Sequence, residues 1–190
     1  MKKDLVNLPD GLPIPKDDGT CNHLLGMIIP DIKLESTKGG LLELKKIESN
    51  FLILYFFPMM AISEKKLPMG WDNIPGARGC TPQNIAINEN MNDLLNYHVT
   101  TIGISTQSII ELANISLMRK FSQIILSDNK LKLKEKLNIP TFQIDNKIMY
   151  KRLTLVVKKS KIIKVFYPIF PPDKHIFEIL NWLKNKSMYY

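Results

Sequence analysis

The feature that most restricts the fold is a continuous run of apolar and aromatic residues from Phe51 to Phe57, which ends at Pro58. A strand without polar alternation is buried on both faces, as in a parallel sheet covered by helices. The run is far shorter than the ~20 apolar residues that cross a membrane. With 190 residues, 45% of them hydrophobic and 23% charged, the chain can bury a sizeable core around this strand. The sequence therefore predicts an ordinary globular protein and excludes a disordered or collagen-like one.

Strand and helix patterns alternate along the rest of the chain. Further strands are expected at residues 99–104, 124–126, 148–157 and 161–166, with a small hairpin at residues 32–44. Helices are expected from Thr81 through Leu95, from Ser108 to about Lys120, before Pro140 and after Asp173. Alternating strands and helices pair their strands in parallel, whereas the last two strands form an antiparallel hairpin. This order predicts an α/β fold, a thioredoxin-like three-layer sandwich with a central mixed sheet.

The beginning of the chain differs in composition from the rest. Residues 1–23 are rich in turn formers, so we expect an N-terminal arm, followed by one domain over residues 24–190. The arm has no apolar run long enough for a signal peptide, and two cysteines offer no disulfide framework. We therefore expect a reduced, cytoplasmic compartment.

The net charge of +8 does not by itself indicate nucleic-acid binding. Only three of the 26 basic residues are arginines, whose planar groups bond phosphates in pairs, and the lysines are scattered. The three histidines lie far apart without metal-ligand spacing, and the sequence has no Cys-x-x-Cys motif. We therefore expect no nucleic acid, membrane, metal or cofactor as a partner.

Cys80 is the strongest candidate for chemistry. It directly precedes a predicted helix, which Thr81 can cap and in which Pro82 suits the first position. The unpaired N–H groups at a helix N-terminus favour a negative charge, so the thiol would ionise to a nucleophilic thiolate. The small residues of the turn at positions 74–79 would let a small substrate approach the sulfur. A buried, inert cysteine is the alternative that position alone leaves open.

The wider pattern resembles a known family. The strand closing in Phe56-Phe57-Pro58, followed by Gly79-Cys80-Thr81-Pro82-Gln83, resembles the active-site region of a peroxiredoxin, in particular the bacterial Q-type branch. Similar segments occur at residues 25–34, 103–105, 126–128 and 152–156. The resemblance covers residues 24–184, and its most specific part is the combination of Cys80 with Arg152.

The resemblance implies a thiol-dependent peroxidase with defined residue roles. The thiolate of Cys80 would attack a peroxide oxygen and become a sulfenic acid, and Arg152 would stabilise the thiolate and the peroxide charge. Pro75 and Gly79 would bind the peroxide, and Thr81 would lie beside the sulfur. The implied substrates are hydrogen peroxide and small organic hydroperoxides, with an external thiol of the glutathione, glutaredoxin or thioredoxin type as reductant. The chain would act as a monomer or homodimer without a cofactor.

The chain departs from the family pattern around the reactive cysteine. Ala77 occupies the position of a threonine whose hydroxyl bonds the thiolate and the peroxide. Thr81 would replace that hydroxyl or only cap the helix. An inserted loop over residues 63–73 separates Pro58 from Cys80, so Pro75 would shield the sulfur instead. Trp71 of this loop would either cover the pocket or anchor the loop.

A further departure concerns the second cysteine of the cycle. Ile85 stands where Q-type relatives often carry a resolving cysteine, and the other thiol is Cys21 in the arm. Cys21 would either form a disulfide with Cys80 or take no part, and we expect a one-cysteine cycle. The competing hypothesis is a thioredoxin-fold binding or regulatory protein without peroxidase activity. Ala77 favours this second hypothesis, whereas the presence of both Cys80 and Arg152 favours the peroxidase.

Overall fold

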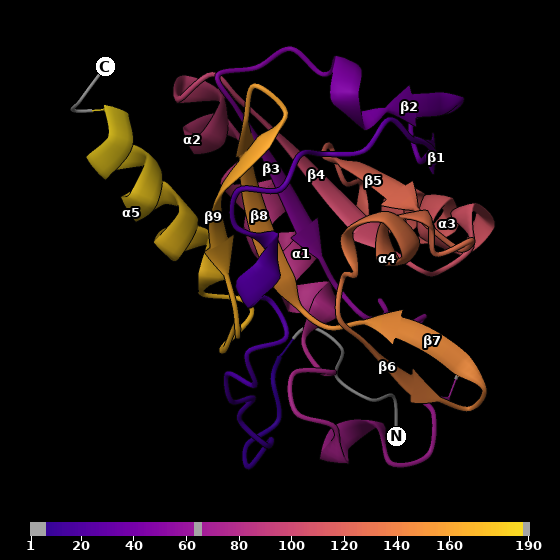
Figure 1. Cartoon of the computed structure of the whole chain (residues 1–190). Helices are drawn as coiled ribbons and strands as arrows, with labels where there is room; N and C mark the ends of the chain where they lie inside the picture. Colours follow the sequence, from indigo (N-terminus) through magenta and orange to yellow (C-terminus); the bar gives the residue numbers. More distant parts are fainter. Residues whose placement is uncertain (1–6, 63–65, 188–190) are drawn as a thin grey trace.

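A seven-stranded mixed sheet forms the centre of the computed structural model, which describes residues 7–62 and 66–187. Its strand order is β2-β1-β5-β4-β3-β8-β9 (Figure 1). The central strands β3 (Phe51–Phe56), β4 (Val99–Ser105) and β5 (Ile124–Ser127) are parallel. The antiparallel strands β8 (Leu153–Lys158) and β9 (Lys161–Phe166) extend one edge, and β1 (Lys33–Ser36) and β2 (Leu41–Glu43) extend the other. The predicted mixed sheet is confirmed.

Alternate residues of β3 divide the core into two layers. Leu52, Leu54 and Phe56 face one layer, which includes α4 (Lys132–Leu137) and the short turns η1 (Asn22–Leu24) and η2 (Leu44–Lys46). Ile53 and Tyr55 face the other, together with α1 (Cys80–Glu89), α2 (Met91–Asn96), α3 (Ile109–Arg119) and α5 (His175–Ser187). Because every residue of β3 is buried, the predicted strand with two covered faces is confirmed, as is the three-layer sandwich.

Short polar side chains accept hydrogen bonds from the first N–H groups of two helices. The hydroxyl oxygen of Ser108 accepts a hydrogen bond from the Glu111 N–H at 3.3 Å, so the predicted cap of α3 is confirmed. The carboxylate of Asp128 accepts hydrogen bonds from the N–H groups of Lys132 and Leu133 at 2.8 Å each, at the start of α4. These contacts satisfy N–H groups that have no partner within the helix.

The helix expected from Thr81 through Leu95 is two helices, because the chain turns at Asn90. The side chain of Asn90 donates a hydrogen bond to the Ala86 carbonyl at 2.8 Å and thereby ends α1. α2 then runs in a new direction, and Leu95, expected on the buried face, is 56% exposed.

The strand expected over residues 148–157 is also two strands. β7 (Lys147–Tyr150) pairs with β6 (Thr141–Ile144) in a separate hairpin, which lies beside the main sheet in Figure 1. The chain then passes through Lys151 and Arg152 into β8. This break matters for the site, because it leaves Arg152 outside both strands, directly before β8.

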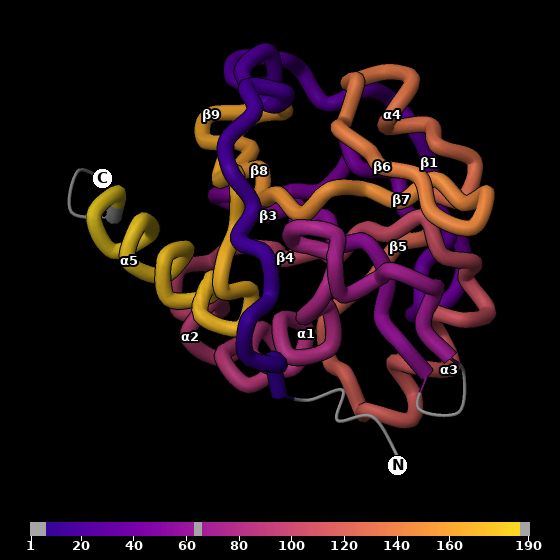
Figure 2. Tube along the Cα trace, turned by 90° about the horizontal axis from the view of Figure 1, so that it is seen from below, coloured from indigo at the N-terminus to yellow at the C-terminus, as the bar shows by residue number. Residues whose placement is uncertain are grey.

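Residues 7–23 of the N-terminal arm cross the molecule past the start of α1 (Figure 2). The carboxylate of Asp18 binds the Lys151 ammonium at 2.5 Å and accepts a hydrogen bond from the Tyr167 hydroxyl at 2.8 Å. Cys21, placed in the arm by the sequence, is buried in the core. The expected boundary between residues 23 and 24 falls within η1, and the division into arm and domain stays a prediction.

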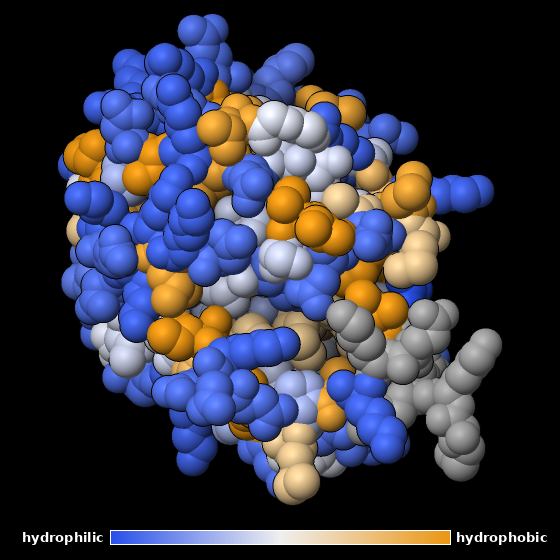
Figure 3. All heavy atoms as spheres, turned by 90° about the vertical axis from the view of Figure 1, so that its right-hand side faces the viewer, coloured by the Kyte–Doolittle hydropathy of each residue, from blue (hydrophilic) through white to orange (hydrophobic). Residues whose placement is uncertain are grey.

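The surface mixes polar and apolar side chains. Figure 3 shows the face with α3, α4 and β7, where apolar residues form separate patches among hydrophilic ones. On α3, the side chains of Ile110, Leu117 and Met118 are exposed. None of the helices within residues 7–62 and 66–187 combines the length and the apolar composition that crossing a bilayer requires.

Candidate active site

Cys80 is the first residue of α1, and a glycine turn places it there. Gly79 has a φ of 95°, a left-handed conformation that glycine adopts without strain. The helix therefore starts before Thr81, and the prediction that Thr81 caps it is wrong. Pro82 is the third helical residue and not the first, a position where its missing N–H still needs no partner.

Arg152 lies beside the sulfur, as the sequence predicts. Its Nη2 donates a hydrogen bond to Cys80 Sγ at 3.2 Å. The same nitrogen lies within hydrogen-bond distance of three carbonyl oxygens of the turn before the cysteine, those of Gly76, Ala77 and Arg78, at 3.2, 3.4 and 3.0 Å. The guanidinium is thus a buried cation that both faces the sulfur and holds the backbone that positions it. A cation fixed in this way can stabilise negative charge that develops on atoms beside it.

Two buried amide side chains hold Arg152 and the Cys80 backbone in place. The sequence reasoning missed both of them. Gln83 accepts a hydrogen bond from Arg152 Nη1 through its Oε1. Asn84 donates to the Cys80 carbonyl oxygen at 2.9 Å and accepts from the Tyr55 hydroxyl at 2.9 Å. Both residues are almost fully buried. Their spacing of three and four residues from Cys80 puts them on the same side of a helix, a signal that was available in the sequence.

A very small cavity lies beside Cys80, a residue that is only 2% exposed. Its volume is about 20 Å³. Gly79 and Thr81 line it as predicted, together with the side chains of Met59 and Trp71. Trp71 is buried and packs against Phe142, with ring centroids 6.0 Å apart, so it both covers the cavity and anchors its loop.

Pro75 does not take the place that the sequence predicts. It is exposed and lies outside the set of described residues that line the cavity. The backbone N–H of Met59, next to the buried Pro58, donates a hydrogen bond to Cys80 Sγ at 3.3 Å. The end of β3 therefore still lies against the sulfur, in spite of the inserted loop.

No family model and no curated protein matches the sequence. Solved structures do match its fold. Peroxidoxin BcpB from Mycobacterium tuberculosis has a TM-score of 0.67 and 22% identity, over 85% of this chain and 96% of that one. Peroxiredoxin Q from Xanthomonas campestris has a TM-score of 0.64 and 17% identity, over 92% of this chain and 96% of that one. A PrxQ mutant from Xylella fastidiosa has a TM-score of 0.67 and 19% identity, over 86% of this chain and 96% of that one.

The chain has the fold of a Q-type peroxiredoxin. Within this fold, the missing threonine leaves the environment of the sulfur partly intact. Ala77 is fully buried, and its carbonyl oxygen accepts a hydrogen bond from the Cys80 thiol at 3.6 Å. The sulfur keeps two donors, the Met59 N–H and the Arg152 guanidinium, neither of which depends on the side chain at position 77.

Cys21 and Cys80 lie on opposite faces of the central sheet of this peroxiredoxin fold. Cys21 packs with Leu24 and Leu54, whereas Cys80 packs in the layer of Ile53 and Ile87. Both thiols are free. Burial and the negative charges of Asp17 and Asp18 raise the pKa of Cys21 to about 12, so it stays a protonated, weak nucleophile at neutral pH.

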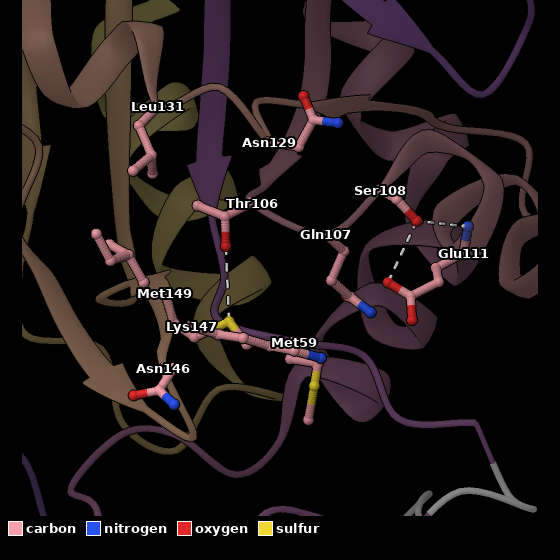
Figure 4. A pocket seen from close by; sticks show the side chains of 11 residues that line it. Met59, Thr106, Gln107, Ser108, Glu111, Asn129, Leu131, Asn146, Lys147 and Met149 are labelled. Carbon is pink, nitrogen blue, oxygen red and sulfur yellow. Dashed lines mark hydrogen bonds between the residues drawn. The ribbon is translucent and has the colours of Figure 1, made fainter.

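A larger cavity of about 420 Å³ lies between α3 and the β6–β7 hairpin (Figure 4). Three of its polar side chains bond to the protein: Ser108 caps α3, Thr106 donates to the Met149 sulfur at 3.6 Å, and Gln107 bonds the backbone. The amide of Gln107 holds the Met60 backbone, through bonds of 2.8 and 3.1 Å. The pocket therefore fixes the chain that follows β3. Within the described part of the chain, no group of His, Cys, Asp and Glu side chains is arranged to hold a metal.

Proposed function

We propose that the protein is a thiol-dependent peroxidase that reduces hydrogen peroxide and small organic hydroperoxides. The observation that carries this proposal is the buried contact of 3.2 Å between Arg152 Nη2 and Cys80 Sγ at the N-terminus of α1. Two of the similar solved structures are consistent with this proposal. One solved structure concerns the alkyl peroxide reduction activity of the Xanthomonas campestris bacterioferritin comigratory protein, and another is thioredoxin peroxidase I of Plasmodium yoelii.

The proposed reaction begins with attack of the Cys80 thiolate on the outer oxygen of the peroxide. An S–O bond forms, the O–O bond breaks, and the leaving oxygen takes up a proton to give water or an alcohol. Cys80 is oxidised to the sulfenic acid while the peroxide is reduced. Arg152 stabilises the charge that moves onto the peroxide oxygens, and Thr81 offers a hydroxyl in the same cavity.

We propose that the sulfenic acid is reduced by an external thiol of the glutathione, glutaredoxin or thioredoxin type. A first thiol forms a mixed disulfide with Cys80 and releases water, and a second thiol releases the Cys80 thiol. Cys21 is a poor candidate for a resolving cysteine because it is protonated and faces the other side of the sheet. Cytoplasmic location and a monomeric or dimeric state stay predictions from the sequence.

Two variants and the wild type test this function: Cys80→Ser, Cys21→Ser and the unchanged protein are each given one equivalent of hydrogen peroxide. We expect wild type and Cys21→Ser to consume peroxide equally and Cys80→Ser to consume none. Mass spectrometry under non-reducing conditions should find a dimedone adduct on Cys80. Peroxide consumption by Cys80→Ser at the wild-type rate would refute the peroxidase, and a quantitative Cys21–Cys80 disulfide would refute the one-cysteine cycle.

A binding or regulatory protein without peroxidase activity is the second candidate, which Ala77 favours. In that case Cys80 would stay reduced in the wild type under the same treatment. The same experiment therefore separates the two functions.

A further inference from the structure

The cavity beside Cys80 holds little more than one small molecule. A cavity needs a volume of about 10–15 Å³ to hold a single water molecule. The cavity measures about 20 Å³, and hydrogen peroxide is only one oxygen atom larger than water. In a cavity of this size, a hydroperoxide with a branched or aromatic carbon group must place most of that group outside, against the residues around the cavity mouth.

One part of that wall comes from the N-terminal arm. Asn7 lines the cavity, and the next residue, Leu8, packs against Gly79. A Cβ atom on Gly79 would lie 2.7 Å from Leu8 Cδ2 and 2.3 Å from Pro172 Cγ. The bare backbone of Gly79 therefore forms a slot that Leu8 and Pro172 fill from outside. Leu8 therefore contacts the residue that directly precedes the reactive cysteine.

The arm is fixed to the active-site region at two further points. Pro15 lies 3.6 Å from the position that a Cβ atom on Gly76 would occupy, in the turn held by Arg152. Asp18 binds Lys151 and Tyr167, and Lys151 directly precedes Arg152. Residues 7–18, which we call the strap, therefore run from the Asp18 ion pair to the cavity. The indigo tube in Figure 2 shows the path of this segment.

We propose that the strap is a specificity element, in which Leu8 limits the Cys80 cavity to hydrogen peroxide and slows larger organic hydroperoxides. The proposal rests on the peroxidase function and names its preferred substrate. Leu8 is a positioning residue here, because it contacts Gly79 and not the reacting atoms. Larger hydroperoxides react only when residues 7 and 8 move away from the Gly79 slot.

The test compares the second-order rate constants of Cys80 oxidation by hydrogen peroxide and by cumene hydroperoxide. In Leu8→Ala we expect the preference for hydrogen peroxide to fall about tenfold, the smallest discrimination that one methylene typically gives in a close-fitting pocket. Asp18→Asn, which weakens the far anchor of the strap, should shift the preference in the same direction. Ile14→Ala is the control within the strap, since Ile14 is 66% exposed, and it should keep the wild-type preference.

A second measurement does not depend on peroxidase activity. Alkylation of Cys80 by iodoacetamide and by a bulky dye maleimide, followed by peptide mass mapping, reports the same size limit. Leu8→Ala should accelerate the bulky reagent far more than the small one. The proposal would be overturned if both Leu8→Ala and Asp18→Asn kept the wild-type ratio of rate constants for the two alkylating reagents and for the two peroxides. If no peroxide reacts at all, the peroxidase function fails, whereas the alkylation ratio still decides the role of the strap.

Discussion

Replacing Arg152 is the sharpest perturbation of the proposed chemistry. Arg152→Met removes the positive charge 3.2 Å from Cys80 Sγ and the hydrogen bonds to the turn before it. Arg152→Lys keeps the charge, but a single ammonium cannot reach both Gln83 and the carbonyl oxygens that the planar guanidinium bonds together. Both variants should therefore react more slowly with peroxide, and Arg152→Met should be the slower of the two.

The expected size of the effect follows from the burial of the contact. Arg152 is 3% exposed and Cys80 is 2% exposed, so water cannot replace the missing donor. Removal of one such preorganised donor lowers rates about 10²–10³-fold, or about 2.7–4 kcal/mol of transition-state stabilisation. A second effect falls on stability, because each buried carbonyl left without a donor costs about 1–3 kcal/mol. Thermal unfolding must therefore accompany every rate measurement.

Tryptophan fluorescence offers a direct assay. The chain has two tryptophans, and Trp71 lines the Cys80 cavity, whereas Trp182 packs in α5 against Phe51 at 5.4 Å. In a Trp182→Phe background, oxidation of Cys80 should change the Trp71 emission during stopped-flow mixing with hydrogen peroxide. Arg119→Met, at the end of α3, is the matched control and should react like its parent. A folded Arg152→Met protein that reacts at the parental rate would refute the reasoning.

Three further predictions concern the surroundings of the sulfur. Gly79→Ala should lower the unfolding free energy by about 1–3 kcal/mol, since its Cβ would meet Pro172 and Leu8, and calorimetry measures this loss. Thr81→Val should slow peroxide reduction while Thr81→Ser keeps it, as stopped-flow rates will show; equal rates in both would remove the hydroxyl from the mechanism. Cys21 has its pKa raised from 9.0 to about 12, so its neutral form contributes stability that is complete below pH 9 and is lost as the pH rises towards 12. Denaturant titrations should therefore find a weaker alkaline decline in Cys21→Ala than in the wild type.

The central sheet could be predicted because its strands carry their signal locally. The run from Phe51 to Phe57 is apolar at every position, and a strand buried on both faces has no other pattern. The β6–β7 hairpin was missed because Ile148 to Val157 looks like one strand on apolar content alone. Its turn did leave a signal, since Asp145 and Asn146 take φ values of 45° and 59°, which these residue types tolerate. The break after Tyr150 comes directly before Arg152, which contacts Cys80 in a distant segment of the chain.

The candidate site divides in the same way. Cys80 and Arg152 could be named from a family resemblance, and the structure brings them together. The Met59 N–H could not be named, because a backbone donor depends on where the chain passes and not on the type of side chain. Pro75 was assigned by its distance along the sequence, whereas its exposed position follows from the path of the inserted loop. The contact of Leu8 with Gly79 is likewise a tertiary contact, across 71 positions of the chain.

The absence of a threonine hydroxyl at position 77 is best understood from the backbone around it. The Ala77 carbonyl oxygen lies near both Arg152 Nη2 and the Cys80 sulfur, at 3.4 and 3.6 Å. An uncharged carbonyl can accept from a thiol but cannot donate to a thiolate, so within residues 7–62 and 66–187 the hydrogen-bond donors to the Cys80 sulfur are the Met59 N–H and the Arg152 guanidinium. The loss of one neutral donor removes part of the thiolate's stabilisation, whereas the charged donor, which contributes about twice as much, remains. The chemistry of this site therefore depends more heavily on Arg152 than it would with a threonine present.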